Sequence, residues 1–174
     1  MKTFIILLTA FALHLAAETN SPAKIEEAFG VTLGKPLPTG RAVSARTNVT
    51  AIFTRFIASN AVPNIPADSY EVSTSVTDSR VHRITLDTKF GTDKEAVEMA
   101  QKFADRLTEK YGPPSTSESS SLNGRMIWKQ NGRSIRLLWT SFDKFHDITL
   151  DYDDDALRAT ALKEFHAAEK NAGF

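Results

Sequence analysis

The amino-acid sequence predicts an α+β domain, built as a tandem αβββ repeat whose antiparallel meander sheets pack on helices, with a C-terminal helix. Three observations predict this class. One segment has the apolar spacing of a helix, another has the turn signal of a β-hairpin, and two landmarks recur in the same order along the chain. A chain of 174 residues is long enough for one domain with its own apolar core.

The clearest helix is predicted to begin at Thr92. Thr92 and Glu95 form a capping box, which satisfies free backbone N–H groups of the first turn. Gly112 and the two prolines that follow it end the helix. Apolar residues recur at helical spacing: Val97, Ala100, Phe103, Ala104, Leu107 and Tyr111. This stripe is expected to pack on a sheet.

The first half of the chain gives weaker signals. Residues 22–29 predict a short helix that ends at Gly30. Residues 31–47 are rich in Gly, Pro and Thr and predict an irregular connection. Three β-rich segments follow, at 49–57, 70–76 and 81–88. The two prolines within 58–68 predict a loop between the first two of these segments.

The turn before the third β-rich segment determines which of its side chains point toward the core. If that turn has three residues, 78–80, Ile84 and Leu86 face the core. His82 then lies on the same side, near the end of the sheet.

The second half of the chain predicts a three-stranded meander. Asn131-Gly132 is a strong signal for a two-residue hairpin turn. A six-residue loop at 141–146 leads to a third strand at 147–152. The predicted pairs are Gln130 with Arg133, Trp128 with Ile135, Met126 with Leu137, Trp139 with Ile148, Leu137 with Leu150 and Ile135 with Tyr152. Apart from the pair beside the turn, these residues form the predicted core face.

The opposite face of this meander is mixed in character. It carries Arg125, Ile127, Lys129, Arg136, Leu138, Thr149 and Asp151. The register sets Arg136 between Ile127 and Asp151. The face is either a solvated surface with one cross-strand ion pair, or a partner-binding surface on which Ile127 and Leu138 are apolar among charges.

The acidic segment 151–155 opens the closing helix, predicted over about 154–170, and its charges suit the positive end of a helix. The stripe of this helix is Leu157, Ala161, Phe165 and Ala168. Alternate aspartates of the segment also match the start of a calcium loop. Ala156 and Leu162 stand where such a loop needs Gly and Glu, so capping is the favoured interpretation and weak calcium binding stays open.

Two landmarks indicate a duplication. The pairs Phe29-Gly30 and Tyr111-Gly112 each end a predicted helix, and the sequence Ile-Thr-Leu-Asp occurs at 84–87 and at 148–151. The two units would span about 21–88 and 92–152. The alternative is coincidence, since short strands of this composition are common.

This order of elements resembles the tandem αβββ architecture of small β-lactamase-inhibitor-type proteins. A helix followed by three strands also resembles the small outer-membrane-assembly lipoproteins. Residues 28–37 (AFGVTLGKPL) and the helix end Lys110-Tyr111-Gly112 resemble small uncharacterised exported bacterial proteins. These resemblances imply an architecture and no activity.

The first seventeen residues have the pattern of a secretory signal peptide. Lys2 precedes an uncharged apolar run, and small residues lead to a cleavage site expected after Ala17. The alternative, an uncleaved membrane anchor, is disfavoured because the run is shorter than the roughly 20 residues of a spanning helix. We therefore expect a periplasmic or secreted protein consisting of one domain, 18–174.

Composition narrows the function classes. Removal of the signal peptide removes Lys2 and no acid, which leaves 20 basic residues against 21 acidic ones and a net charge of −1. This balance gives no bias toward nucleic acid or an anionic membrane. The chain has no cysteine, which excludes disulfides, thiol chemistry and a lipoprotein anchor. We expect no stable membrane insertion after cleavage.

No catalytic, cofactor or metal motif stands out. The mature chain has three histidines, His82, His146 and His166, and none belongs to a recognised ligand pair. His166 and Glu169 share a helix face, but two polar residues on a surface helix are the simpler interpretation. The serine-rich stretch 115–121 carries no nucleophile motif and predicts a mobile loop.

The function expected is therefore an exported, non-catalytic binding module for a protein partner, such as an inhibitor, an immunity-type protein or an envelope accessory protein. The residues expected to bind are Arg125, Ile127, Lys129, Arg136 and Leu138. The alternative is a small extracytoplasmic hydrolase that uses His82 or His146 with a carboxylate. We expect no cofactor.

Overall fold

An eight-stranded antiparallel sheet dominates the computed structural model, which describes residues 21–37, 42–47, 51–57, 69–75 and 77–171. The strand order is β3-β4-β5-β6-β10-β9-β8-β7, so the sheet consists of two four-stranded meanders. The meanders join where the last strand of each, β6 and β10, pair with one another.

The first meander contains β3 (Ala42–Thr47), β4 (Ala51–Ile57), β5 (Ser69–Ser75) and β6 (Val81–Lys89). The second contains β7 (Thr116–Ser119), β8 (Asn123–Gln130), β9 (Arg133–Phe142) and β10 (Phe145–Asp154). Helix α1 (Asp93–Tyr111) connects the meanders, and α2 (Asp155–Asn171) follows the second. A separate hairpin of β1 (Glu27–Ala28) and β2 (Val31–Thr32) precedes the sheet.

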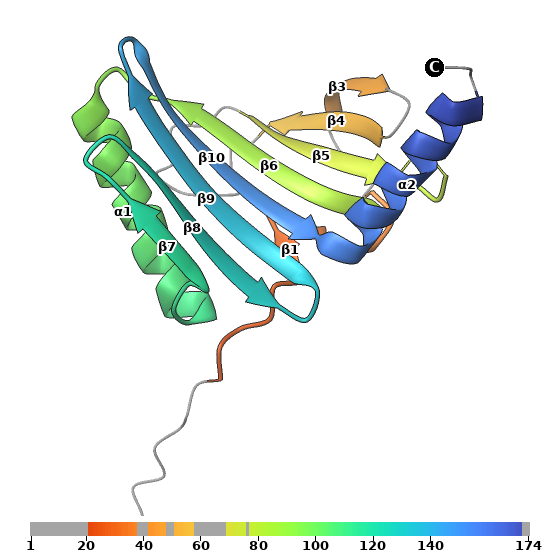
Figure 1. Ribbon diagram of the computed structural model, residues 1–174, viewed down its shortest axis with the longest axis horizontal. Coiled ribbons are helices and arrows are strands. Elements are labelled where there is room, and N and C mark those ends of the chain that lie inside the picture. Colours follow the sequence, from red (N-terminus) through yellow and green to blue (C-terminus); the bar gives the residue numbers. More distant parts are fainter. Residues whose placement is uncertain (1–20, 38–41, 48–50, 58–68, 76, 172–174) are drawn as a thin grey trace, which may run out of the picture.

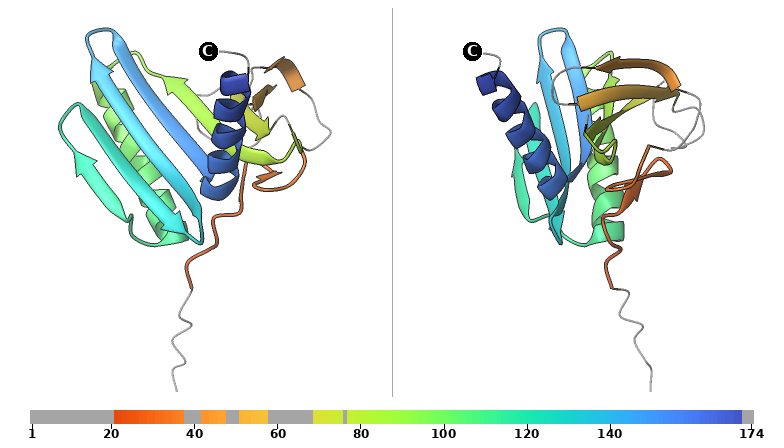
Figure 2. Two further views of the ribbon diagram at one scale, coloured as in Figure 1. Left: turned by 45° about the vertical axis from the view of Figure 1, so that its right-hand side comes forward. Right: turned by 90° about the vertical axis from the view of Figure 1, so that its right-hand side faces the viewer.

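The two faces of the sheet are covered by different elements. Helix α1 and the β1–β2 hairpin lie against one face, and α2 lies against the other (Figures 1 and 2). The first face holds the main apolar core, which includes Trp128, Ile135, Leu137, Ile148 and Leu150. The α+β class with a closing helix, predicted from the sequence, is confirmed.

Helix α1 follows its sequence signals closely. The Thr92 hydroxyl accepts a hydrogen bond from the Glu95 backbone N–H at 3.3 Å, and Gly112 ends the helix with a φ of 81°. The buried face is Ala96, Ala100, Phe103, Ala104, Leu107 and Tyr111. Val97, predicted on this face, is partly buried and packs against the same core. A capped amphipathic helix is specified by local signals that tertiary packing does not override.

The register predicted for the second meander is confirmed. All six predicted cross-strand pairs occur, including Trp128 with Ile135 and Leu137 with Leu150. The prediction of a six-residue loop at 141–146 is wrong, because β9 continues to Phe142 and β10 begins at Phe145. A two-residue turn joins them and preserves the register, since shortening a loop symmetrically leaves the same residues opposite each other.

The short helix predicted over 22–29 is also wrong. Phe29 and Gly30 form a two-residue hairpin turn with φ values of 54° and 75°. Both positions of such a turn need left-handed backbone, which Gly30 adopts without cost. An isolated helix of about two turns is unstable. Here the segment instead buries apolar side chains on either side of the turn: Ile25, Ala28, Val31 and Leu33.

Side chains of the β8–β9 hairpin hold this N-terminal segment in place. The Gln130 side-chain oxygen accepts a hydrogen bond from the Ile25 backbone N–H at 3.1 Å. The Arg133 guanidinium donates to the backbone carbonyls of Ile25 at 3.2 Å and Leu33 at 3.3 Å. These contacts replace the intrahelical hydrogen bonds that the sequence predicted.

Two segments predicted without regular structure contain strands. The connection 31–47 includes β2 and β3, and the serine-rich stretch 115–121 includes β7. Strand β7 is short, polar and at the edge of the sheet, so its hydrophobic pattern is absent and only its backbone pairing with β8 defines it. The other predicted strands correspond to β4, β5 and β6, and the predicted loop at 58–68 lies outside the described residues.

The two Ile-Thr-Leu-Asp segments meet at the centre of the sheet. They pair antiparallel in β6 and β10, with Leu86 opposite Leu150. The Thr85 hydroxyl donates to Asp151 at 2.6 Å, and the Thr149 hydroxyl donates to Asp87 at 2.7 Å, so the two contacts are reciprocal. The αβββ repeat itself is not confirmed, because each meander has four strands and the first helix is absent.

The predicted signal peptide, 1–17, lies outside the described residues. Among the described helices, none is long and apolar enough to cross a membrane.

Replacement of Gly124 by alanine is predicted to destabilise the fold. A Cβ atom at this position would overlap the indole ring of Trp139, which lies directly opposite in β9. Overpacking of this kind costs about 1–3 kcal/mol. Chemical denaturation should show this loss for Gly124→Ala and little change for Gly91→Ala, where the new Cβ meets only the end of the Glu95 side chain. Equal stability of the two variants would contradict the packing described.

Candidate functional site

The face of the sheet opposite α1, here called the outer face, carries the residues that the sequence predicted to bind. Cross-strand neighbours form rows across this face. One row contains Asp87, Thr149, Leu138, Arg125 and Glu118. The next row, nearer to α2, contains Thr85, Asp151, Arg136, Ile127 and Thr116. The predicted position of Arg136 between Ile127 and Asp151 is confirmed.

Helix α2 covers one end of the outer face through a buried ion cluster. The Asp153 side chain, 1% exposed, lies under this helix. Its carboxylate is 2.7 Å from Arg83 Nε, 3.1 Å from Arg136 Nη2 and 3.7 Å from Arg158 Nη1. Arg158 comes from α2, whereas the other two arginines come from strands. The cluster therefore joins the helix to β6, β9 and β10.

Burial and charge act in opposite directions on these arginines. Burial favours the neutral form of Arg83, but the hydrogen bond to Asp153 and the charges of Asp151 and Asp153 together outweigh burial and raise the pKa of Arg83. The pKa of Arg158 is lowered by burial and by the nearby charge of Arg83. Three cations share two carboxylates, Asp151 and Asp153, so removal of either acid would leave positive charge without a partner.

Further contacts fix the start of α2. The Ser134 hydroxyl donates to the Asp155 carboxylate at 2.9 Å. The Asp154 carboxylate accepts a hydrogen bond from the Leu157 backbone N–H at 3.1 Å, which caps the helix. Ala161 is buried against the sheet, and Glu164 accepts a hydrogen bond from Thr77 at 2.8 Å. The capping interpretation of the acidic segment is thus supported by its contacts.

The predicted binding residues fall into two environments. Arg136 is held between Asp151 and Asp153, at 2.8 Å and 3.1 Å, and belongs to the ion cluster. Arg125 is exposed and pairs with Glu118 at 3.0 Å, and Lys129 is exposed. Ile127 and Leu138 are partly exposed. The structure therefore places four of the five on accessible surface and gives Arg136 a structural ion pair.

Two phenylalanines extend this surface and were missed by sequence reasoning. Phe142 and Phe145 are cross-strand partners at the tip of the β9–β10 hairpin, and they are 74% and 62% exposed. By strand alternation they lie on the same face as Leu138. We call Arg125, Ile127, Leu138, Phe142 and Phe145 the uncovered patch. Continuing the predicted register two residues into the presumed loop would have located both aromatic rings.

A serine and a histidine meet near this tip. Ser141 Oγ lies 2.6 Å from His146 Nδ1 across the β9–β10 pair. No sequence motif indicated that a serine contacts this histidine. Ser141 is only 3% exposed, and its backbone N–H donates to Leu122 and Asn123. Ser141 and His146 both line a shallow hollow beside Thr92, but Ser141 itself is almost covered, so the contact fits a structural hydrogen bond better than a nucleophile.

The two histidines of the hydrolase hypothesis lie at opposite ends of the sheet. His82 is near the start of β6 and His146 is near the start of β10, and these strands run antiparallel. His146 accepts a backbone hydrogen bond from Phe90, eight residues along β6 and its continuation from His82, so at about 3.4 Å per residue the two histidines are about 27 Å apart. His82 is buried, and within the described residues neither of its ring nitrogens has a hydrogen-bond partner.

The described part of the chain contains no preformed metal site. In it, no group of three or more acidic or histidine side chains is arranged so that it could hold a metal ion. The aspartates of the calcium-loop pattern are directed to other partners. Asp151 and Asp153 contact arginines, and Asp155 accepts from Ser134. The Glu169 side chain, predicted as a possible partner of His166, lies outside the described residues.

His82 is predicted to make stability depend on pH. Burial lowers the pKa of His82, and the Arg83 charge lowers it further. The imidazole of His82 therefore binds a proton more readily in the unfolded chain than in the folded one. The contribution of neutral His82 to the free energy of unfolding is complete above the pKa of the unfolded chain, about 6.5, and is lost as the pH falls below that value. When the pH is lowered from about 7.5 to about 5.5, the free energy of unfolding of the wild type should fall by on the order of 1 kcal/mol more than that of His82→Phe.

Urea denaturation at both pH values measures this difference. Leu162→Gln, at an exposed position of α2 that carries no titratable group, is the control and should keep the wild-type pH dependence. Parallel pH profiles for wild type and His82→Phe would contradict the prediction.

Comparison of this chain with family models, curated proteins and solved structures found no match. The architectural resemblances noted in the sequence therefore stay predictions. Functional inference depends on the geometry of the chain itself.

Proposed function

We propose that this chain is an exported, non-catalytic binding module and that the uncovered patch contacts a protein partner. The single observation that carries this proposal is the position of α2. The helix covers one end of the outer face and leaves Leu138, Phe142 and Phe145 accessible on the rest. A role limited to packing would not need two aromatic rings exposed on a hairpin tip.

The composition of the patch suits a protein interface. Aromatic residues and arginine are enriched among the residues that dominate binding energies. Here Phe142 and Phe145 lie beyond Leu138 on the same face, and Arg125 is the cross-strand neighbour of Leu138. Apolar groups bordered by charge are typical of the centre and rim of an interface.

The scaffold under the patch is rigid. Strands β8, β9 and β10 pair along their whole lengths, and their other face is buried against the core. A partner would therefore meet a surface that is already ordered, which lowers the entropic cost of binding. An inhibitor, an immunity-type protein or an envelope accessory protein would each use such a surface. The export that this function requires is proposed from the signal-peptide pattern of 1–17.

The alternative proposal is a small extracytoplasmic hydrolase based on His146. One observation favours it, the 2.6 Å contact between Ser141 Oγ and His146 Nδ1. The burial of Ser141 weighs against it. Among the described residues no carboxylate is hydrogen-bonded to His146, so the third member of a catalytic triad is missing.

The binding proposal predicts that substitutions in the patch remove a partner without unfolding the protein. Purified wild type, Leu138→Glu and the double variant Phe142→Ser/Phe145→Ser would be used to capture proteins from envelope extracts. We expect the wild type to retain a specific partner and both variants to bind it at least tenfold more weakly. Loss of a central apolar or aromatic contact has an effect of this size.

Leu162→Glu provides a matched control, because Leu162 is an exposed leucine on α2, away from the patch. It should capture the same partner as the wild type, and thermal unfolding should show that all variants fold. A partner that binds wild type and both patch variants equally would exclude the patch. Absence of any specific partner would count against a protein-binding role.

A further inference from the structure

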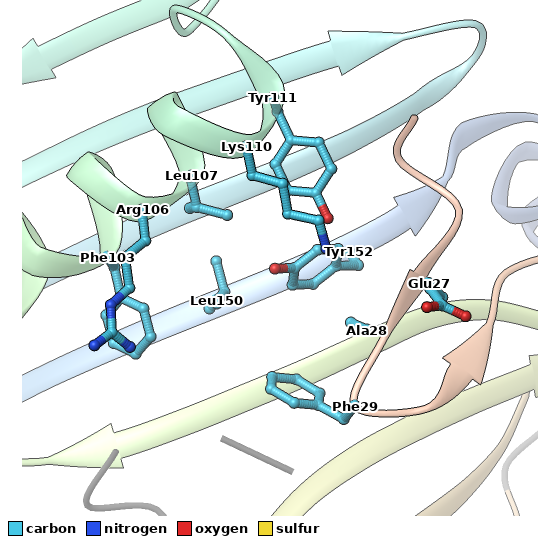
Figure 3. Close-up of a pocket in the computed structure, with 10 residues that line it drawn as sticks. All are labelled: Glu27, Ala28, Phe29, Phe103, Arg106, Leu107, Lys110, Tyr111, Leu150 and Tyr152. Atoms are coloured by element: carbon cyan, nitrogen blue, oxygen red, sulfur yellow. The ribbon is translucent and has the colours of Figure 1, made fainter. Parts of the chain in front are cut away.

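A hollow lies on the opposite side of the sheet, between α1, β10 and the β1–β2 hairpin. Its volume is about 230 Å³ (Figure 3). An apolar cavity of about 150 Å³ can hold benzene. The hollow is therefore large enough for an aromatic ring, or a short alkyl chain, with a small polar group attached. The uncovered patch and the residues proposed to act there contribute nothing to it.

The floor and walls of the hollow are apolar and aromatic. Phe29 comes from the hairpin, Phe103 and Leu107 from α1, and Leu150 and Tyr152 from β10. The Phe29 ring lies 6.2 Å from the ring of Tyr152 in an edge-on arrangement. Such a wall favours a flat or flexible apolar group.

Two tyrosine hydroxyls supply polar atoms inside this apolar lining. In Figure 3 the Tyr152 hydroxyl points along the hollow toward Leu150, and the Tyr111 hydroxyl points toward Tyr152. Neither hydroxyl is hydrogen-bonded to another residue of the described chain, and neither is sealed from solvent. Both can therefore bond a ligand oxygen.

Two cations stand on the α1 side of the hollow. Arg106 and Lys110 are one helical turn apart and both line the hollow, but their charged ends lie at different places: in Figure 3 the Arg106 guanidinium is beside Phe103 and the Lys110 ammonium is beside Tyr152. Within the described residues, neither has a carboxylate partner, and Lys110 only approaches the Tyr111 ring at 5.1 Å. Glu27 is the single acid of the lining and comes from the hairpin. The rim therefore has a positive excess.

The backbone of Phe29 is a further indication. Phe29 occupies a left-handed conformation, φ 54°, at a turn position that favours Asn, Asp or Gly. A bulky residue in this region is uncommon, and such outliers concentrate at ligand sites. The conformation sets the ring against Tyr70, at 5.1 Å, and over the hollow.

From these observations we infer that the hollow binds a small amphipathic carboxylate. The apolar body, an aromatic ring with a short chain or a medium-length alkyl chain, would lie against Phe29, Phe103 and Leu150. The carboxylate would face Lys110 beside the Tyr152 hydroxyl, where a charge-assisted hydrogen bond can form, and Arg106 would add positive charge at the other end of the hollow. The tyrosine hydroxyls would donate to its oxygens or to an ordered water.

Isothermal titration calorimetry tests this inference on the purified protein. The probes are 3-phenylpropionate, octanoate and the uncharged analogue 3-phenylpropan-1-ol. We expect one carboxylate per chain, bound at least tenfold more tightly than the alcohol, because the alcohol loses the charged contacts. Whichever of the two acids binds more tightly identifies the apolar body as aromatic or alkyl.

Variants locate the site. The double variant Arg106→Gln/Lys110→Gln should lose the preference for the acid over the alcohol. Phe29→Asn, whose new residue suits the left-handed backbone, should bind both the acid and the alcohol more weakly. Lys163→Gln, which removes an exposed cation of α2 on the other face of the sheet, should bind like the wild type, and Glu27→Gln should bind equally or more tightly. Thermal unfolding checks that each variant folds.

Several results would overturn the inference. They are the absence of saturable carboxylate binding, equal affinity for acid and alcohol, and an unchanged preference in Arg106→Gln/Lys110→Gln. Weaker binding in Glu27→Gln would also do so, because it would indicate a site for cations.

Discussion

The buried carboxylate of Asp153 fixes how the two faces of this sheet are used. Three arginines surround it, and one of them, Arg158, belongs to α2. Because an unpaired buried charge is costly, the helix is held where these partners meet. Helix α2 therefore covers one end of the outer face, while α1 and the hairpin enclose the other face. The patch lies on the part of the outer face that α2 leaves open, and the hollow lies on the other face, beneath α1.

Features determined by neighbouring residues could be predicted from the sequence. The capping box at Thr92, the stop at Gly112 and the Asn131-Gly132 turn each act locally, and the structure contains all three. The N-terminal hairpin could not be predicted, because its conformation depends on contacts with Gln130 and Arg133 more than 100 residues away. Strand β7 has no apolar pattern, and its contacts to β8 are backbone pairing and the ion pair between Glu118 and Arg125.

The candidate site was only partly predictable for the same reason. Register alone located Ile127, Leu138 and Arg136 on one face, because alternation along a strand is strict. The sequence could not show that Arg136 would be drawn into the Asp153 cluster, since Arg158 reaches that cluster only after α2 folds back over the sheet. The hollow combines residues of three distant elements and has no local signal at all.

Hydrogen exchange of α2 amides in Asp153→Asn is the most direct test of the central role of this carboxylate. Removal of its charge leaves Arg83, Arg136 and Arg158 with one buried acid fewer, and loss of a buried partner costs on the order of 3 kcal/mol. We expect α2 to exchange much faster than in the wild type, while α1 keeps its protection. Asp87→Asn, which changes an exposed acid of the same face, should leave α2 unaffected. Unchanged protection of α2 in Asp153→Asn would contradict the account.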